Sequence, residues 1–253
     1  MQPRRQFLAL IAALGCQPRP PPVALRWRQA AAGLQYASAQ ISGDGGHQPA
    51  LAHLLRLDLQ VVRLQVVLAP EVGAPLADAA AFRRHAGGLA AVNAGFFDPA
   101  FRPLGLLVSG GAELSPLRKV DHGVFWVAGG RAHVDHARQW LRAPNLEFAV
   151  ECGPRLLVSG TAPHFRQSDT ARRVALGLDA QRRTVLAVSD GAVTLHDFAA
   201  WLARPEVAGG PGLVDALNLD GGPSAMLDVA AGNLVAEVRS PVQVPVGLVI
   251  AAR

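Results

Sequence analysis

Short apolar runs separated by turn residues divide this chain into segments that are typical of β-strands. Residues 54–69 (LLRLDLQVVRLQVVLA) alternate apolar and polar positions and predict one or two strands. Residues 89–97 (LAAVNAGFF) predict a buried strand that runs into a turn. Further strands of a multi-stranded sheet are predicted at 104–109, 123–128, 148–150, 155–159, 174–178 and 184–189, and two or three closing strands within 226–250.

Helices are few in this pattern. Residues 75–84 are rich in helix formers, carry basic residues near their end, and precede the glycine pair at 87–88, so they predict a helix. Thr194 is a good helix N-cap, with Asp197 three residues further on, and opens a second helix with the sequence LHDFAAWLA.

Turns and loops fall between these elements. Ser189, Asp190 and Gly191 predict a hairpin turn, whereas residues 27–53 show little periodicity and contain a glycine-rich loop at 43–46. The predicted class is α+β, with a mixed, largely antiparallel multi-stranded sheet and a few packed helices.

Composition supports a globular domain and leaves two explanations for its charge. The 253 residues are 50% hydrophobic and 17% charged, which suits one sizeable domain or two small lobes sharing a core. The net charge of +5 comes from arginine, since Lys119 is the sole lysine. Either the abundance of arginine reflects a GC-rich genome, or some of the arginines bind an anionic ligand. They are scattered rather than clustered with aromatic residues, which argues against nucleic acid as a partner.

The N-terminus predicts export. Residues 1–16 (MQPRRQFLALIAALGC) join a basic start to a short apolar run, as in a signal peptide. Arg4 and Arg5 are similar to a twin-arginine pattern, with Pro3 where Ser or Thr is usual. Cys16 is similar to a lipoprotein cleavage site; the alternative is an ordinary cleaved signal with an incidental cysteine. The predicted location is periplasmic, membrane-anchored through a lipid on Cys16, or secreted.

These observations divide the chain into three parts. Residues 1–16 form the signal, 17–50 a tether and N-terminal extension, and 51–253 the folded domain. If Cys16 carries a lipid, Cys152 has no cysteine to pair with. Cys152 is then interpreted as a buried thiol rather than a nucleophile, because no His or Asn context singles it out.

Three segments carry polar residues at strand ends, and each has a purely structural alternative. In AVNAGFFDP, Asn93 could orient a hydroxyl or a phosphate oxygen, or could simply form an Asx-turn beside two core aromatics. In ECGPRLLVSG, Glu151 could act as an acid or base, but its signal is weak. In TARRVALGL, Arg172 or Arg173 could clamp a phosphate, or could be surface arginines.

The fourth segment, ALNLDGGPSAML, is the most informative. Asn218 and Asp220 share strand parity, so a regular strand would project both side chains to one face. Gly221 and Gly222 would allow close approach of a ligand or a tight backbone turn. A carboxylate at that place could serve as general acid, general base or metal ligand, whereas the alternative is a structural strand end.

These four segments, in this order, resemble the phosphodiester glycosidase family over roughly residues 54–253. The resemblance places Asn93, Gly95 and Phe97 in one site loop and Gly153 in the next, with Arg173 ahead of a strand and Asp190 in the following turn. The resemblance also assigns five residues to the last site segment: Asn218, Asp220, Gly221, Gly222 and Ser224. Three features depart from the pattern: Pro223 replaces a glycine, Glu151-Cys152 replaces a polar–small pair, and no glycine stands just before Thr194.

The resemblance implies hydrolysis of a carbohydrate phosphodiester. Asp220, Asn218, Arg173 and Asn93 are then the expected catalytic residues, and Arg172 is the second candidate for holding the phosphate. No histidine cluster has zinc spacing, so a metal, if one is used, would be oxygen-bound Ca²⁺ or Mg²⁺. Two rival hypotheses remain: an envelope lipoprotein that binds anionic polysaccharide without turnover, and a secreted metal phosphodiesterase.

Overall fold

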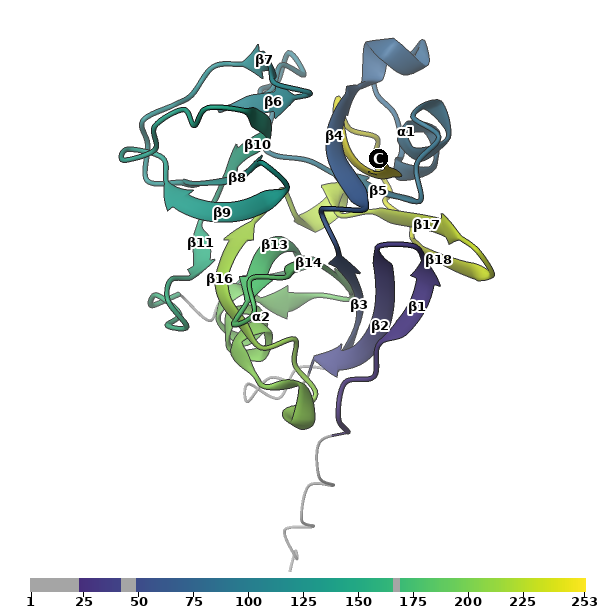
Figure 1. The fold of residues 1–253 in the computed structure, drawn as a ribbon, viewed down its shortest axis with the longest axis vertical. Helices are drawn as coiled ribbons and strands as arrows, with labels where there is room; N and C mark the ends of the chain where they lie inside the picture. Colours follow the sequence, from purple (N-terminus) through teal and green to yellow (C-terminus); the bar gives the residue numbers. More distant parts are fainter. Residues whose placement is uncertain (1–22, 42–48, 166–168) are drawn as a thin grey trace, which may run out of the picture.

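The computed structural model describes residues 23–41, 49–165 and 169–253 (Figure 1). The predicted signal peptide, Cys16 and the glycine-rich loop at 43–46 lie outside these residues. The strands form a seven-stranded sheet, two five-stranded sheets and a two-stranded ribbon, and all of their pairings are antiparallel. The expected antiparallel α+β architecture is therefore confirmed in outline, although sheets dominate it.

The seven-stranded sheet begins with two strands that the sequence did not predict. Its order is β1 (Arg28–Ala31), β2 (Leu34–Ile41), β3 (Ala50–Leu57), β14 (Thr184–Asp190), β13 (Val174–Asp179), β16 (Leu213–Asn218) and β11 (Arg155–Leu157). In β2, Tyr36 packs into the central core while Ala37 and Ile41 pack into the core on the other face. Because both faces of β2 are partly buried, it lacks the clean alternation by which a strand is recognised.

The two five-stranded sheets complete the frame. One has the order β7 (Ala112–Ser115), β6 (Leu107–Ser109), β10 (Leu146–Cys152), β8 (Gly123–Ala128) and β9 (Arg131–His136). The other has the order β18 (Leu234–Val238), β17 (Leu227–Ala231), β5 (Ala90–Asn93), β19 (Val246–Ala252) and β4 (Val62–Leu68). The ribbon pairs β12 (Thr170–Ala171) with β15 (Val193–Thr194).

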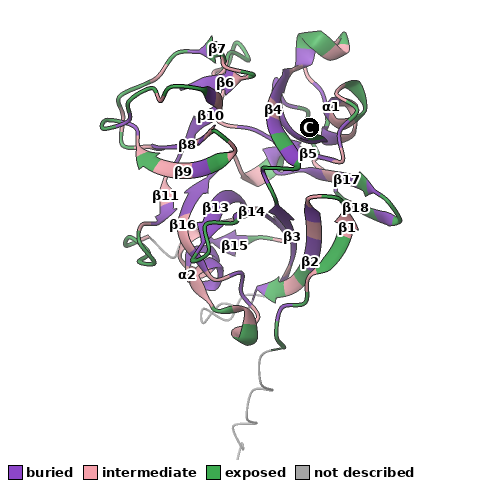
Figure 2. Cartoon of the chain, in the orientation of Figure 1, coloured by how far each residue is buried: buried purple, intermediate pink, exposed green. Residues whose placement is uncertain are grey.

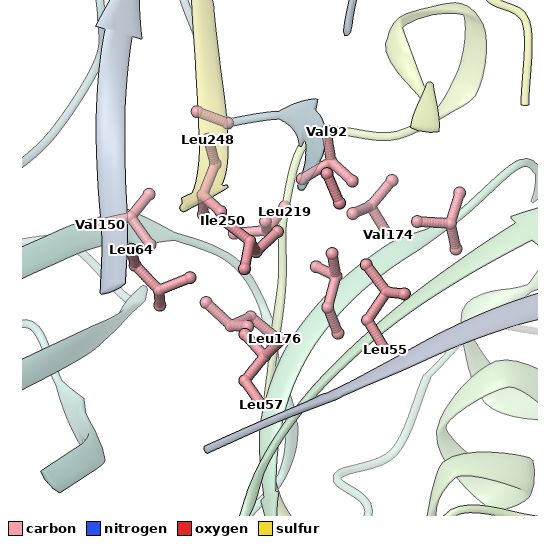
Figure 3. Packing of buried hydrophobic residues seen from close by; sticks show 14 of the residues in the cluster. Leu55, Leu57, Leu64, Val92, Val150, Val174, Leu176, Leu219, Leu248 and Ile250 are labelled. Carbon is pink, nitrogen blue, oxygen red and sulfur yellow. The ribbon is translucent and has the colours of Figure 1, made fainter. Parts of the chain in front are cut away.

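The inner faces of the three large sheets share one apolar core. Figure 2 shows that strands of all three sheets carry buried residues. Leu55 and Leu176 enter it from the seven-stranded sheet, Val150 from β10, and Val92 and Ile250 from the sheet of β5 and β19 (Figure 3). Burial of such side chains is the main favourable term in folding. The core thus fixes how the three sheets, and the strand ends that carry the polar segments, lie relative to one another.

In the described part of the chain, two α-helices cover outer faces of the sheets. Helix α1 (Ala79–His85) packs Phe82 against the sheet of β5 and β19, and helix α2 (Leu195–Ala203) packs Phe198 and Trp201 against the seven-stranded sheet. Three short 3₁₀ helices complete the secondary structure of the described residues: η1 (Ala69–Val72), η2 (Glu206–Ala208) and η3 (Gly222–Ser224).

Two local predictions need correction. The first helix begins at Ala79 rather than residue 75, because Asp78 caps it and Ala77 is held in a bridge with Val244. The turn after Ser189 does not close a hairpin: β14 pairs with β13 and β3, whereas β15 pairs with β12. Turn residues mark a change of direction but do not determine which strands pair across it.

Among the described residues, no helix is long and apolar enough to cross a membrane.

Cys152 is fully buried in the central core, as predicted, and burial raises the pKa of its thiol far above the ordinary value. The thiol is therefore in the unreactive protonated form at neutral pH.

The cap of α2 gives a first testable prediction. Thr194 Oγ1 accepts a hydrogen bond from Asp197 N at 3.0 Å and donates one to Asp197 Oδ2 at 2.9 Å. Thr194→Ala should lower the free energy of unfolding by about 1 kcal/mol in chemical denaturation, whereas Thr194→Ser should retain most of it. Equal stability of the Ala and Ser variants would contradict the cap.

Candidate functional site

The segment around Asn218 and Asp220 lies where β16 ends. Asn218 is the last residue of β16, and its amide Nδ2 donates to Gly153 O at 3.0 Å and to Leu219 O at 2.7 Å. Its Oδ1 is buried and has no hydrogen-bond partner. A buried acceptor without a donor is costly, so this oxygen is suited to receive a hydrogen bond from a bound group.

Asp220 follows the strand and is held by its own loop. Its Oδ1 accepts from Gly221 N at 3.0 Å, and its carboxylate also receives the Ser224 hydroxyl. Burial raises the pKa of Asp220, and the hydrogen bonds from Ser224 and Gly221 offset only part of that rise. The carboxyl group therefore stays protonated to a higher pH than an ordinary aspartate, which is a property of general acids.

Asn93 fastens this loop to the end of β5. Its Nδ2 donates to Asp220 O at 2.6 Å, and its Oδ1 accepts from Met226 N at 3.1 Å. Asp220 N in turn donates to Ala94 O at 3.2 Å. The two polar groups of Asn93 thus bind the main chain on either side of the loop, which points to positioning of Asp220.

Three predicted glycines lie where another segment of the chain comes too close for a side chain. A Cβ at Gly95 would lie 2.9 Å from Glu151 O, one at Gly153 would lie 2.8 Å from the His122 ring, and one at Gly221 would lie 2.8 Å from Arg172 O. Any larger residue would push these segments apart. The glycines therefore set how closely the loops after β5, β10 and β16 approach β10, the start of β8 and the start of β13, respectively.

The loop after Gly221 accommodates the proline that departs from the family pattern. Gly222 has a φ of 60°, and Pro223 follows it inside the 3₁₀ helix η3. Gly222 N donates to Arg172 O at 2.8 Å. The left-handed turn is thus made by the glycine, and the proline occupies a helical position that suits its fixed φ.

Arg172 lines an open depression beside this loop. Its Nη2 lies 3.2 Å from Asp190 Oδ1, and its Nη1 donates to Arg239 O. The depression has a volume of about 650 Å³ and is formed by Thr170, Ala171, Arg172, Gly222, Pro223, Arg239, Ser240 and Pro241. Of the cavities that the described residues enclose, this one contains predicted site residues.

Arg173 is half-buried and bound to main-chain oxygens. Its Nε donates to Val193 O at 3.1 Å, its Nη2 donates to Asp169 O at 2.6 Å, and its backbone N–H donates to Ser189 Oγ at 2.7 Å. Burial lowers the pKa of Arg173, and Asp169 partly restores it. A desolvated guanidinium interacts more strongly with an anion than an exposed one does.

The structure thus brings most of the predicted residues together and separates one. Hydrogen bonds and close contacts link the segments of Asn93, Gly153, Arg172 and Asn218–Ser224. Phe97 instead packs against the cluster around α1 and lies 6.1 Å from Phe101 between ring centroids.

Two further observations concern a second cavity and possible metal ligands. A cavity of about 890 Å³ between β9 and the ends of β2 and β3 contains none of the predicted site residues. In the described part of the chain, no three His, Cys, Asp or Glu side chains gather as a metal-ligand set.

One neighbour of the site was not anticipated. His122 immediately precedes β8, packs on Gly153 and lies 3.8 Å from the Glu151 carboxylate, measured from Nδ1 to Oε1. The available signal was the Asp-His-Gly sequence at 121–123, a polar pair and a glycine directly before an apolar run. The same signal also fits an ordinary loop, so the pattern alone could not identify this histidine.

Comparison with known proteins identifies related sequences. The model of a family described as phosphodiester glycosidase matches residues 86–251, more than half of the chain. A curated relative, the uncharacterized protein YigE of Escherichia coli strain K12, is 26% identical over 123 residues. That match covers 44% of this chain and 48% of the relative, so it spans about half the length of that protein.

Three solved structures share the fold. The catalytic domain of zebrafish N-acetylglucosamine-1-phosphodiester alpha-N-acetylglucosaminidase, auto-inhibited by its pro-peptide, has a TM-score of 0.68 at 20% identity and covers 91% of this chain and 89% of its own. A putative exported protein from Burkholderia pseudomallei has a TM-score of 0.65 at 13% identity and covers 98% and 100%. A hypothetical protein from Synechocystis has a TM-score of 0.60 at 17% identity and covers 90% and 64%.

Proposed function

This chain belongs to the phosphodiester glycosidase family, and we propose that it hydrolyses the linkage between a sugar and a phosphate in a carbohydrate phosphodiester. The observation that carries the proposal is the meeting of Asp220, Asn218 and the Arg172–Arg173 pair at one set of strand ends. In this arrangement the main chain of Arg172 binds the Asp220 loop through Gly222 N, the Asp220 carboxyl group has a raised pKa, and the Asn218 amide oxygen is buried without a partner.

The residues divide the work of such a hydrolysis. Arg173, with Arg172 as the second candidate, holds the phosphate by charge-assisted hydrogen bonds. Asp220 gives its proton to the phosphate oxygen as the bond to the sugar breaks. Asn218 Oδ1 accepts a hydrogen bond from a substrate hydroxyl, and Asn93 holds the Asp220 loop in place.

The setting of this activity is also part of the proposal. The N-terminal sequence supports an exported protein that is periplasmic, anchored by a lipid on Cys16, or secreted. Its substrate would then be an envelope polysaccharide or glycan that carries a phosphodiester. A Ca²⁺ or Mg²⁺ ion would find oxygen ligands in the Asp220 carboxylate and Asn218 Oδ1, so a chelator belongs in the test.

A para-nitrophenyl diester of a sugar-1-phosphate tests the function. The proposed reaction releases free sugar and para-nitrophenyl phosphate, whereas a general phosphodiesterase releases yellow para-nitrophenolate. We expect the first pair of products for at least one sugar in a series that includes N-acetylglucosamine, glucose, mannose and galactose. Loss of turnover with chelator would favour metal chemistry, and binding without turnover for every sugar would favour the polysaccharide-binding alternative.

The phosphate-binding role of Arg173 gives a second prediction. Removal of a hydrogen bond to a charged group costs about 1.5–3 kcal/mol, so Arg173→Ala should lower kcat/KM by about 10- to 100-fold, and Arg173→Lys should recover part of the loss. Arg142→Ala is the control, since Arg142 is exposed and pairs with Glu113 in another sheet. Unchanged kcat/KM in Arg173→Ala, with Arg172→Ala impaired, would transfer the role to Arg172.

A further inference from the structure

The Glu151 carboxylate is buried at the end of β10 with one oxygen unused. Its side chain has no exposed surface, and its Oε2 accepts from Leu106 N and Arg118 N, each at 2.9 Å. Its Oε1 has no hydrogen-bond partner. An unpaired oxygen of a buried carboxylate is costly. Glu151 Oε1 is therefore suited to accept a hydrogen bond from a group that approaches it.

The neighbour that faces this oxygen is His122. Its Nδ1 lies 3.8 Å from Glu151 Oε1, within ion-pair range but longer than a hydrogen bond. The side chain of His122 remains 29% exposed. Since Nδ1 faces the buried carboxylate, Nε2 is the nitrogen left for a substrate or a water molecule.

The surrounding chain fixes both side chains. A Cβ at Gly105 would lie 2.9 Å from the Glu151 carboxylate, so this glycine leaves the carboxylate its place. The His122 ring lies against Gly153 and 5.8 Å from the Phe96 ring between centroids. In the register of β8 and β10, Gly123 is opposite Cys152, which brings His122 beside Gly153.

This pair adjoins the site already described. The carbonyl of Gly153, on which His122 packs, accepts the hydrogen bond from Asn218 Nδ2. The charges of both Asp220 and Glu151 act on the thiol of Cys152, so both carboxylates lie near this residue. The pair and Asp220 therefore border the same group of strand ends.

We propose that His122 is the general base of the reaction and that Glu151 is its positioning residue. The proposal rests on the hydrolysis proposed above. A water oxygen forms a bond to the anomeric carbon, and its proton passes to His122 Nε2. The bond between that carbon and the phosphate oxygen breaks, and its electron pair goes to the phosphate, which takes the proton of Asp220. Glu151 Oε1 faces His122 Nδ1, and its negative charge stabilises the imidazolium that forms.

Other charged groups around His122 set the background for its pH behaviour. Asp121 precedes it and binds His136 Nε2 at 2.9 Å. The stem of Arg155 packs at Gly123, and its charge acts on Asp121. Arg118 offers only its backbone N–H to Glu151. The dyad therefore predicts an acidic limb in the rate profile that depends on both His122 and Glu151.

The test measures kcat and KM against pH with the sugar whose para-nitrophenyl phosphodiester the wild type cleaves. We expect His122→Asn to lower kcat by about 100-fold or more, to leave KM little changed and to remove the acidic limb. Glu151→Gln should lower kcat less and displace that limb. His85→Asn, at an exposed histidine at the end of α1, is the control. His122→Asn with wild-type kcat and an intact acidic limb would overturn the proposal.

A second readout needs no turnover and does not depend on whether the Glu151→Gln variant folds, because it can be made on the wild type. Nitrogen NMR of the His122 ring should show the proton on Nδ1 in the wild type and a shift toward Nε2 in Glu151→Gln. A wild-type ring protonated on Nε2 would overturn the dyad whatever the activity. If the wild type cleaves no sugar phosphodiester, the proposed function fails, and the catalytic role of His122 fails with it even where the tautomer is as expected.

Discussion

Asp220→Asn should lower kcat/KM for a sugar phosphodiester by about 100- to 10,000-fold, the usual contribution of a general acid. The amide keeps the size of the carboxyl group and can still accept from Gly221 N and Ser224, so the loop should keep its shape. It cannot deliver a proton to the departing phosphate. The loss should therefore appear in kcat, and the residual rate should lack the alkaline limb of the pH profile.

The direction of that limb follows from the environment of Asp220. Burial raises its pKa, so the acid form persists to higher pH than in an ordinary aspartate and is lost as pH rises further. Asp58→Asn is the matched control, because Asp58 is exposed and its Oδ1 accepts from Gln60 N in a turn. An Asp220→Asn enzyme with more than half the wild-type kcat would show that another group supplies the proton.

Asn93→Ala should lower the free energy of unfolding by about 2–4 kcal/mol, because it leaves two main-chain polar groups without a hydrogen-bond partner. Met226 N and Asp220 O each lose their bond to the Asn93 side chain, which is 1% exposed. An orphaned buried polar group costs about 1–3 kcal/mol. The variant should also lose activity at temperatures where it remains folded, since Asp220 is no longer tied to β5.

Urea denaturation and turnover of the same preparation measure both effects. Asn233→Ala, at an exposed asparagine in the turn between β17 and β18, is the control and should change stability by less than about 0.5 kcal/mol. If Asn93→Ala unfolded like the control but lost activity, Asn93 would act on the substrate directly.

Much of the fold could be predicted from local pattern. Alternation and bounded apolar runs locate β3 to β5, β8 and β13, and the Thr194–Asp197 pair predicts the start of α2 at the observed residue. The pattern fails for β2, whose two faces are both partly buried, for β1, a four-residue strand at the edge of the sheet, and for the turn at Asp190. Which strand pairs with which depends on the three-sheet core, and a local window carries no information about it.

The candidate site, too, could be predicted only in part from the sequence. Strand ends, glycines and polar residues mark Asn218 and Asp220, but parity along the strand does not describe their final geometry, since β16 ends at Asn218. The role of Asn93 as a fastener depends on Met226, more than a hundred residues away. The meeting of His122 and Glu151 depends on the register of β8 against β10, which the sequence of neither strand specifies.

The central claim is that water attacks the sugar and not the phosphorus. Hydrolysis of the para-nitrophenyl sugar phosphodiester in water enriched in heavy oxygen tests it directly, with mass spectrometry of both products. We predict that the label enters the anomeric hydroxyl of the released sugar and that para-nitrophenyl phosphate stays unlabelled. Label in the phosphate would show attack at phosphorus and would contradict the glycosidase mechanism.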